Sequence, residues 1–475
     1  MSSLTPRPPY TDAELQKLYP PNLDLHLVQI LMRHGERTPV NARFQNTGLP
    51  PFWPYCSPVR QLTSTILSPL PSNPTTPNSS PEPNLDTLQW KRRLETFSPQ
   101  DDTPTLALSP SGHPDNICDM GTLTDLGRQT TYNLGLRLRD LYISRLRFLP
   151  SEITSTTQFY LRTTPVPRAL ESLQQTFTAL YPPSTRLPSA STPVIITRAH
   201  ADETLYPNDA NCRRFAALSR AFAQRAADRH NNTPDMEYLS HLYSKWMDPP
   251  GQKVAVDSRP RLSGIMDTIN ATYAHGPQTR LPKEFYDERA REIIERVGVE
   301  EWFQGYRESR EYRALGIGGL MGDLVGRMVG AVENKGEEDV KFGLHGCHDT
   351  TLAGVLASLG AFETEKWPPF TSHVAVELFK DQKGGIGRRS MEELSEAEKK
   401  RLEGYYVRLR YNDEVVTVPG CRKPGRHLEG DESFCTLAAF KEIVDKFTPK
   451  NWKQECRMSR GETVSVPKEP EWAGY

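Results

Sequence analysis

The sequence lacks a long hydrophobic run and has almost no excess of charge of either sign. No apolar stretch reaches the length of about 18 residues that a transmembrane helix needs, so we predict no membrane-spanning segment. The chain has 58 Lys and Arg residues against 59 Asp and Glu residues, which gives a net charge of -1. This balance does not favour nucleic acid or a membrane surface as a partner. Positive charge that binds an anionic ligand must therefore be local.

Targeting features and regular cysteine spacing are also missing. Residues 1–9 have neither the basic start nor the apolar stretch of a signal peptide, and they are too poor in arginine for a transit peptide. We therefore predict an intracellular, cytoplasmic protein. The seven cysteines are widely spaced and include no C-x-x-C pair, which argues against a disulfide framework and against a zinc or redox site. Together these absences favour reduced thiols.

Residues 57–117 differ in composition from the rest of the chain. They contain repeated Ser-Pro pairs, and the run from Pro71 to Pro81 consists only of Pro, Ser, Thr and Asn. Such a composition buries too little apolar surface to offset the entropy of ordering, so we predict a mobile insertion. Within it, residues 85–97 are compatible with a helix or an interaction segment, although a spacer is the interpretation we favour.

The remaining chain shows strand and helix signals in alternation, which indicates an α/β fold. Thr124 is suited to cap a helix that begins after it, Pro165 suits the first turn of a second helix, and Gly360 suits the end of a third. Residues 209–330 have apolar pairs at helical spacing and few strand signals, which predicts a helical cap. Strands are predicted at residues 25–32, 158–162, 194–196, 341–344, 374–379, 405–411 and 414–418.

The most informative residues follow the first of these strands and read Arg33-His34-Gly35-Glu36-Arg37-Thr38-Pro39. Open α/β sheets place their ligand sites at the carboxyl ends of strands. Arginine binds phosphate through two parallel charge-assisted hydrogen bonds. A histidine held between two arginines can attack a phosphorus atom. The loop therefore predicts a site of phosphoryl transfer.

Two further predicted strands end in charged residues and are followed by helices. The first carries Arg162 before two threonines, and the second carries His348 and Asp349 before two threonines. Helix N-termini attract anions through free amide groups and the helix dipole. Each of these signals is weak alone, but together with R-H-G-x-R-x-P they indicate one phosphate site built from three strand ends.

These motifs resemble those of the histidine acid phosphatases, the larger branch of the histidine phosphatase superfamily. The sequences at 123–127, 367–370, 377–378 and 419–421 add to the resemblance, which covers residues 23–60 and 118–458 apart from the helical region. Residues 205–208 and 366–371 look most like the lysophosphatidic acid phosphatase branch. The resemblance implies a phosphoglycerate mutase-like mixed sheet flanked by helices, with a helical cap insertion.

The same resemblance implies a domain organisation. An N-terminal extension at 1–22 and a C-terminal tail at 459–475 would flank a histidine phosphatase domain at 23–458. The α/β core of this domain would comprise residues 23–56, 118–208 and 331–458, interrupted by the insertion at 57–117 and the cap at 209–330.

A two-step mechanism without a metal ion or other cofactor is also implied. His34 would be the nucleophile that forms a phosphohistidine, and Asp349 would protonate the leaving alcohol. A bound phosphate dianion would raise the pKa of Asp349 and keep it protonated. The groups expected to bind the phosphoryl oxygens are Arg33, Arg37, Arg162 and His348.

Several residues have alternative roles. Arg168 lies near the same strand end as Arg162 and can replace it in the phosphate site. His34 can be a structural turn residue, and Asp349 can be no more than a helix cap. Glu36 would oppose phosphate binding if it pointed inward, so we expect it to face away.

The function also has alternatives. The expected substrate is a small phosphomonoester, including a lysophospholipid, and protein partners are unknown. A non-catalytic phosphate-binding or interaction protein on the same fold would need the arginines but not Asp349. A metallohydrolase with His34, His348 and Asp349 as ligands would lack the usual H-x-H and H-E-x-x-H signatures.

Overall fold

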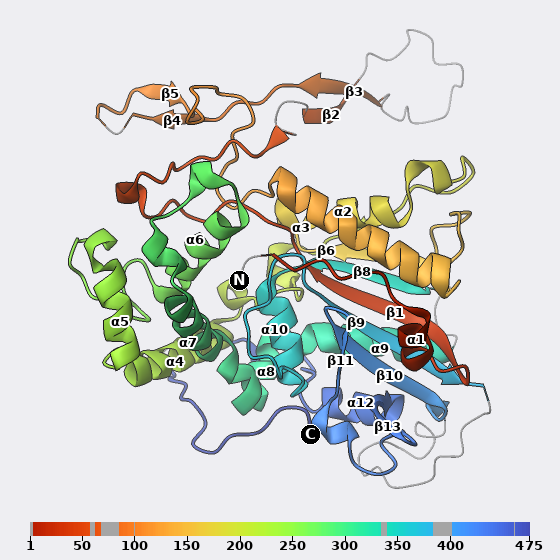
Figure 1. The fold of residues 1–475 in the computed structure, drawn as a ribbon. Helices are drawn as coiled ribbons and strands as arrows, with labels where there is room; N and C mark the ends of the chain where they lie inside the picture. The colour runs from red at the N-terminus through yellow and green to blue at the C-terminus, as the bar shows by residue number, and fades with distance from the viewer. Residues whose placement is uncertain are drawn as a thin grey trace.

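The computed structural model describes residues 3–57, 62–67, 85–98, 100–333, 340–382, 401–459 and 461–475. A mixed sheet flanked by helices forms its centre (Figure 1), as the sequence predicted. Its strand order is β12 (His427–Leu428), β13 (Asp431–Thr436), β10 (Tyr405–Tyr411), β9 (His373–Asp381), β1 (Leu23–Arg33), β8 (Phe342–Cys347), β6 (Phe159–Thr163) and β7 (Ile195–Ile196), with β11 (Glu414–Val416) paired to β10. Parallel pairing joins β1 to β8, β8 to β6 and β6 to β7. The strands β9, β10 and β13 run antiparallel to their neighbours.

Alternating residues of the central strand β1 bury both faces of the sheet. Val28, Ile30 and Met32 pack into one hydrophobic cluster, and Leu27 and Leu31 pack into another. The first cluster includes residues of α2 (Asp125–Arg139) and α3 (Pro167–Leu180), and the second includes residues of α9 (Gly319–Glu333), α10 (Asp349–Ser358) and α12 (Leu437–Asp445). Helices therefore cover both faces, and a strand buried on both faces reads as a nearly continuous apolar run.

Capping residues explain where the core helices begin and end. The Thr124 hydroxyl accepts a hydrogen bond from the Gly127 amide at the start of α2, and Pro167 occupies the first turn of α3. Gly360 follows α10 with a φ of 64°, a left-handed conformation that favours glycine. The three predicted helices are therefore present, although the second begins at Pro167 and not at Pro165. The predicted strands are also present, with ends shifted by a few residues.

The region 209–330 divides between a cap and the core. Helices α4 (Arg213–His230), α5 (Pro234–Tyr243), α6 (Leu262–Ala274) and α7 (Glu288–Glu308) lie together beside the sheet, at the left of Figure 1. By contrast, α9 follows α8 (Arg310–Arg313) and packs under the sheet, where the Gln29 side-chain amide donates to the Leu324 carbonyl at 3.0 Å. The predicted cap therefore includes one helix that belongs to the core.

One continuous helical stretch, Arg310–Glu333, is long and apolar enough to cross a membrane when judged by length and composition alone. Half of its most apolar window is buried inside the protein, and its Leu320, Leu324 and Met328 belong to the main hydrophobic core. Helices that pack in a protein core can meet the same criteria as a membrane span.

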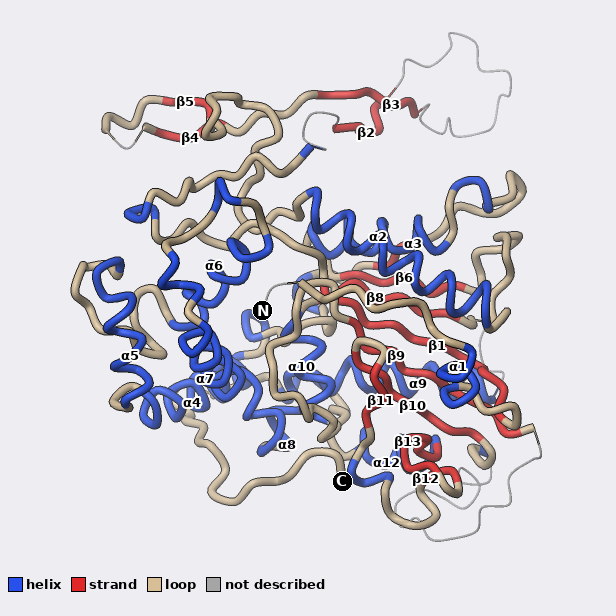
Figure 2. The backbone as a smooth tube through the Cα atoms, viewed as in Figure 1, coloured by secondary structure: helices blue, strands red, loops and turns tan. Residues whose placement is uncertain are grey.

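Part of the insertion at 57–117 forms two β-hairpins that project from the body (Figure 2). One pairs β2 (Leu62–Leu67) with β3 (Leu85–Trp90), and the other pairs β4 (Glu95–Phe97) with β5 (Pro104–Leu106). Residues 85–90 are therefore a strand, and the helical interpretation of that segment is wrong. Residues 58–61, 68–84 and 99, to which the predicted mobility also applied, lie outside the described residues.

Six of the seven cysteines form disulfides, which contradicts the prediction of reduced thiols. The pairs are Cys56–Cys118, Cys212–Cys456 and Cys421–Cys435, whereas Cys347 is free and buried. Their sequence separations of 62, 244 and 14 residues explain why the spacing showed no framework. Disulfides persist in oxidising compartments, so these pairs weigh against the cytoplasmic location, which remains a prediction.

Both ends of the chain pack on the core. Helix α1 (Asp12–Leu18) follows a segment in which the Tyr10 hydroxyl donates to Asp413 at 2.7 Å. Near the other end, after α13 (Trp452–Glu455), the Gly420 amide donates to the Gly474 carbonyl at 2.7 Å. The predicted extension and tail are thus held against the body of the protein at these points.

Candidate active site

The loop that follows β1 is held between two other elements. The His34 amide donates to the Cys347 carbonyl of β8 at 3.1 Å, which brings the ends of both strands together. Gly35 lies against Gly127 so closely that a Cβ atom on Gly35 would come within 2.3 Å of the Gly127 carbonyl oxygen. The two glycines therefore allow the loop to contact the first turn of α2.

His34 has the tautomer and charge of a nucleophile. Its Nδ1 atom lies 2.8 Å from the Gly35 carbonyl oxygen. Because a carbonyl oxygen only accepts, Nδ1 must carry the proton and Nε2 keeps a free lone pair. Burial lowers the pKa of His34 well below 6.5, and the positive charges of Arg168, Arg33 and Arg37 lower it further. The imidazole is therefore held neutral.

Arg33, Arg37 and Arg168 place positive charge around His34 from β1, the following loop and the start of α3. The Nε atoms of all three are buried and have no hydrogen-bond partner among the described residues. Burial and repulsion from Arg37 lower the pKa of Arg168 to about 10. Phe370 supports two of the guanidinium groups, which lie 4.1 Å (Arg33) and 5.7 Å (Arg37) from its ring centre. Like charges held together in this way favour an anion between them.

Arg162 does not belong to this group, which corrects its expected role. Its side chain is 1% exposed and lies 2.6 Å from the Glu203 carboxylate and 3.3 Å from that of Asp323. Arg162 is also not among the charged groups that lower the pKa of His34 most strongly. The buried Glu203 carboxylate therefore binds Arg162, and the structure favours the alternative, Arg168.

His348 begins α10 beside His34. The ring centres of the two histidines are 5.5 Å apart, and His348 Nε2 lies 3.1 Å from the Thr164 hydroxyl. Burial, followed by the positive charge of Arg168, lowers the pKa of His348 to about 3. A neutral His348 can donate one hydrogen bond to a phosphoryl oxygen.

Asp349 points toward the arginines and does more than cap α10. One carboxylate oxygen lies 2.7 Å from Arg33 Nη2 and accepts a hydrogen bond from the Trp367 indole at 2.9 Å. The other accepts from the Thr350 amide. Burial acts to raise the pKa of Asp349, but Arg33 and Trp367 outweigh it and the pKa is lowered. Asp349 is therefore ionised in the ligand-free site.

Glu36, which was expected to face away from the phosphate site, binds α2. It is fully buried, and its carboxylate accepts a hydrogen bond from the Thr130 hydroxyl of α2 at 2.5 Å. Its pKa is raised by burial.

The N-terminal segment and the cap both support the arginines indirectly. The Leu4 amide donates to the Phe370 carbonyl at 3.2 Å, so the segment before α1 holds the residue that packs on Arg33 and Arg37. On the opposite side, Asp267 of α6 lies 2.8 Å from Arg37 and 3.1 Å from Arg43. The cap thus orients one of the phosphate-binding candidates.

No group of three or more His, Cys, Asp or Glu side chains in the described part of the chain is arranged to hold a metal ion. The three arginines around His34 and His348 would also repel a cation. The site is thus better suited to an anion.

Comparison with known proteins agrees with this geometry. The sequence pattern of the histidine phosphatase superfamily, branch 2, matches residues 24–412. The chain belongs to this family. A probable acid phosphatase of Schizosaccharomyces pombe is 36% identical over 468 residues, which cover 92% of this chain and 95% of the relative. The human lysophosphatidic acid phosphatase type 6 is 23% identical, with coverage of 94% and 89%.

Solved structures show the same fold for this histidine phosphatase. The Hafnia alvei phytase in complex with tartrate has a TM-score of 0.54 at 12% identity and covers 93% of this chain and 100% of its own. The Bifidobacterium longum multiple inositol polyphosphate phosphatase in complex with inositol hexasulfate has the same TM-score and identity, with coverage of 95% and 98%. The predictions of family, fold and an acid phosphatase enzyme are confirmed.

The sequence alone indicated no role for three residues of the site. Trp367 and Phe370 stood in a motif that resembled the family, but only the structure shows that they contact Asp349 and the arginines. Asp267 lies in the middle of a cap helix without any surrounding motif. Its role depends on how the cap packs against the loop after β1, which no local pattern reveals.

Proposed function

We propose that this histidine phosphatase hydrolyses phosphomonoesters through a phosphohistidine formed on His34. The observation that supports this most directly is the neutral His34 with a free Nε2, surrounded by Arg33, Arg37 and Arg168. In the first step, Nε2 attacks phosphorus, the ester P–O bond breaks, and the alcohol oxygen takes a proton. In the second step, water attacks phosphorus, the N–P bond breaks, and inorganic phosphate leaves.

Asp349 is the proposed proton donor of the first step and proton acceptor of the second. Its pKa is lowered by Arg33 in the free site, so it must gain a proton when the substrate binds. A phosphate dianion competes for the guanidinium of Arg33 and adds negative charge nearby, and both effects raise the pKa of the carboxyl group. Substrate binding thus prepares Asp349 to protonate the leaving oxygen.

The three arginines and His348 supply the remaining stabilisation. Phosphoryl transfer spreads negative charge over the three non-bridging oxygens, and fixed cationic donors stabilise that charge without reorganisation. The buried Nε atoms of Arg33, Arg37 and Arg168 lack other partners among the described residues. This mechanism does not require a metal ion.

Lysophosphatidic acid is the substrate that we propose within this class. The human, bovine and mouse relatives that bear the name lysophosphatidic acid phosphatase type 6 match more than 90% of this chain. A cavity with aromatic walls, which Thr350 also lines, provides the apolar surface that such a leaving group needs.

The decisive assay is phosphate release from an aryl phosphate between pH 4 and 8 in the presence of EDTA. We expect EDTA-resistant activity that vanadate inhibits, that disappears in His34→Ala and that falls in Asp349→Ala. Activity that EDTA abolishes would favour a metallohydrolase instead. A folded wild-type protein that binds phosphate but releases none at any pH would indicate a non-catalytic binding protein.

A further inference from the structure

A cavity of about 610 Å³ lies between the cap and α10, next to the proposed proton donor. Thr350, which follows Asp349, contributes to its wall. Trp302 and Phe303, which also line it, pack on Trp367 with ring centres 6.0 and 4.8 Å away. Trp367 in turn donates to Asp349. The cavity is thus linked to the carboxyl group that would protonate the leaving oxygen through Thr350 and through the Trp367 ring.

Aromatic side chains from the cap and α8 form much of the cavity wall. Phe215 of α4, Phe303 and Tyr306 of α7, and Tyr312 of α8 line it. All four are almost completely buried. The rings make the wall largely apolar, and the volume of about 610 Å³ leaves room for a ligand larger than a phosphate group.

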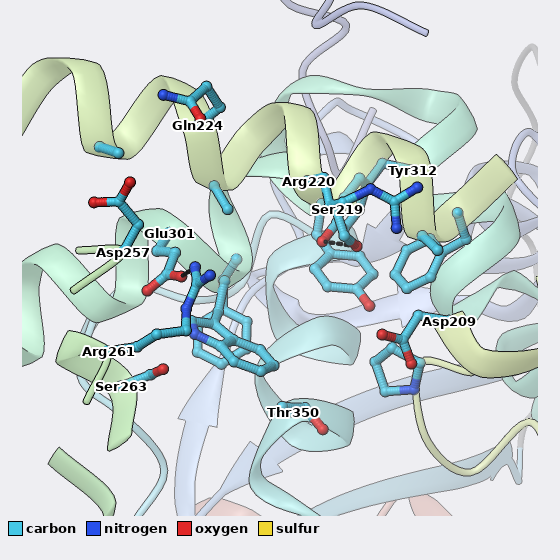
Figure 3. Close-up of a pocket in the computed structure, with 18 residues that line it drawn as sticks. Asp209, Ser219, Arg220, Gln224, Asp257, Arg261, Ser263, Glu301, Tyr312 and Thr350 are labelled. Carbon is cyan, nitrogen blue, oxygen red and sulfur yellow. Dashed lines mark hydrogen bonds and ion pairs between the residues drawn. The ribbon is translucent and has the colours of Figure 1, made fainter. Parts of the chain in front are cut away.

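Ionisable groups stand at both ends of the cavity (Figure 3). Glu301, Arg261 and Asp257 lie together at one end, and Tyr312, Arg220 and Asp209 lie at the other. The three carboxylates outnumber the two arginines, and Arg261 lies 2.6 Å from Glu301. This charge balance does not favour an alcohol that carries several further phosphate groups.

Two polar atoms of the lining are buried without a hydrogen-bond partner among the described residues. They are Oε2 of Glu301 and the hydroxyl oxygen of Tyr306. Glu301 is 5% exposed, and its other carboxylate oxygen accepts a hydrogen bond from Arg261. Burial raises the pKa of this carboxyl group, and the hydrogen bonds from Arg261 and Trp302 oppose that rise. Burial of a polar atom without a partner is unfavourable, so Oε2 is suited to accept a hydrogen bond from a ligand.

We propose that this cavity binds the alcohol part of the substrate and selects apolar alcohols that carry a hydroxyl or ammonium group able to donate to Glu301. The inference rests on the proposed phosphatase function, because the alcohol must leave from the phosphorus atom beside Asp349. The aromatic walls contact the hydrocarbon portion, and Glu301 recognises the single donor group.

The test uses straight-chain alkyl monophosphates of increasing length that end in a methyl, a hydroxyl or an ammonium group. For at least one chain length, we expect the donor-terminated ester to exceed the methyl-terminated ester in kcat/KM by about tenfold, the effect of one hydrogen bond to a charged group. Inositol hexakisphosphate should be a poor substrate. An aryl phosphate measured in parallel reports the chemical step.

Variants of Glu301 then separate the two kinds of donor. Glu301→Leu should abolish the preference for either donor. Glu301→Gln should abolish a preference for ammonium but retain part of a preference for hydroxyl, because its amide oxygen still accepts. The matched control is Glu300→Gln on the same helix, which removes a carboxylate paired with Arg229 and His230 and should leave the preference unchanged.

Three outcomes would overturn the inference. Equal kcat/KM values for all three termini at every chain length, with aryl phosphate hydrolysed normally, would reject the role of the cavity and leave the phosphatase mechanism intact. A donor preference that persists in folded Glu301→Leu would show that another residue recognises the donor. Absence of hydrolysis for every ester would reject the phosphatase function, and the inference would fail with it.

Discussion

The strand-end site and the cavity of the cap differ in how they arise from the sequence. At the strand ends, a short loop and two helix starts concentrate His34, Arg33, Arg37, Arg168 and Asp349 in one place. In the cap, Glu301 and Tyr306 come from one helix, and Arg261 precedes another. The comparison places the proposed chemistry in the core and the proposed selectivity for the alcohol in the cap.

The largest expected effect concerns proton donation in the core. Asp349→Asn should lower kcat/KM, which reports formation of the phosphohistidine, for an alkyl phosphate by about 10²–10⁴-fold, because a positioned general acid contributes that much. The same variant should lower kcat/KM for a nitrophenyl phosphate far less, since that leaving group needs no proton. Steady-state kinetics with both esters provides the measurement. Equal losses for the two esters would indicate that Asp349 only positions other groups.

A second prediction separates the two neighbouring arginines of the core. Arg168→Ala should lower kcat/KM for aryl phosphate by about 10²–10³-fold, because it removes one fixed charge from the phosphate site. Arg162→Ala should mainly destabilise the protein, by about 3–5 kcal/mol in unfolding free energy, because Glu203 would remain buried and unpaired. Kinetics and chemical denaturation measure the two effects.

The double variant Arg162→Met with Glu203→Met is the control for this assignment. It removes both charges of the buried pair and should recover most of the lost stability. If the folded double variant loses aryl phosphatase activity as strongly as Arg168→Ala, Arg162 would belong to the phosphate site after all.

A third prediction addresses the attachment of the cap to the core. The double variant Cys212→Ser with Cys456→Ser opens the disulfide at the start of α4 and should lower the unfolding free energy by about 2–4 kcal/mol. Its kcat/KM for aryl phosphate should change little, because no group near His34 is altered. Thermal unfolding with and without a thiol reductant tests this. A wild-type protein whose stability does not respond to reductant would contradict the three pairs.

The smallest predicted effect concerns the N-terminal segment. Leu4→Pro removes the amide that donates to the Phe370 carbonyl, a loss of about 1 kcal/mol that corresponds to roughly fivefold weaker binding. Because Phe370 packs on Arg33 and Arg37, inorganic phosphate should become a correspondingly weaker inhibitor. Leu4→Ala keeps the amide and is the matched control. Equal inhibition constants for both variants would show that this contact does not influence the arginines.

Local signals in the sequence predicted the core well. The apolar run 25–32 predicted a strand, Thr124 predicted a helix start, and the His348-Asp349 pair predicted charged groups at another helix start. Each prediction succeeded because the structure concerned depends on adjacent residues. The end of β1 and the starts of two helices could therefore be assigned to one site from the sequence alone.

Contacts between distant segments were not predictable in this way. Arg162 and Arg168 both lie near the end of β6, and only the position of Glu203 decides which of them is free. The cysteine pairs join residues up to 244 positions apart. Helix α9 has the same periodicity as the cap helices, but its packing partners place it under the sheet. Tertiary packing decides each of these cases.

The most direct test of the account is to trap the covalent intermediate. Rapid alkaline quenching during turnover of a phosphate-labelled aryl ester should give label bound to His34 in the wild-type protein, and no label in His34→Ala. Label should also turn over into inorganic phosphate at a rate consistent with kcat. A wild-type enzyme that hydrolyses the ester at full rate without any labelled His34 would contradict the phosphohistidine mechanism and point to direct attack by water.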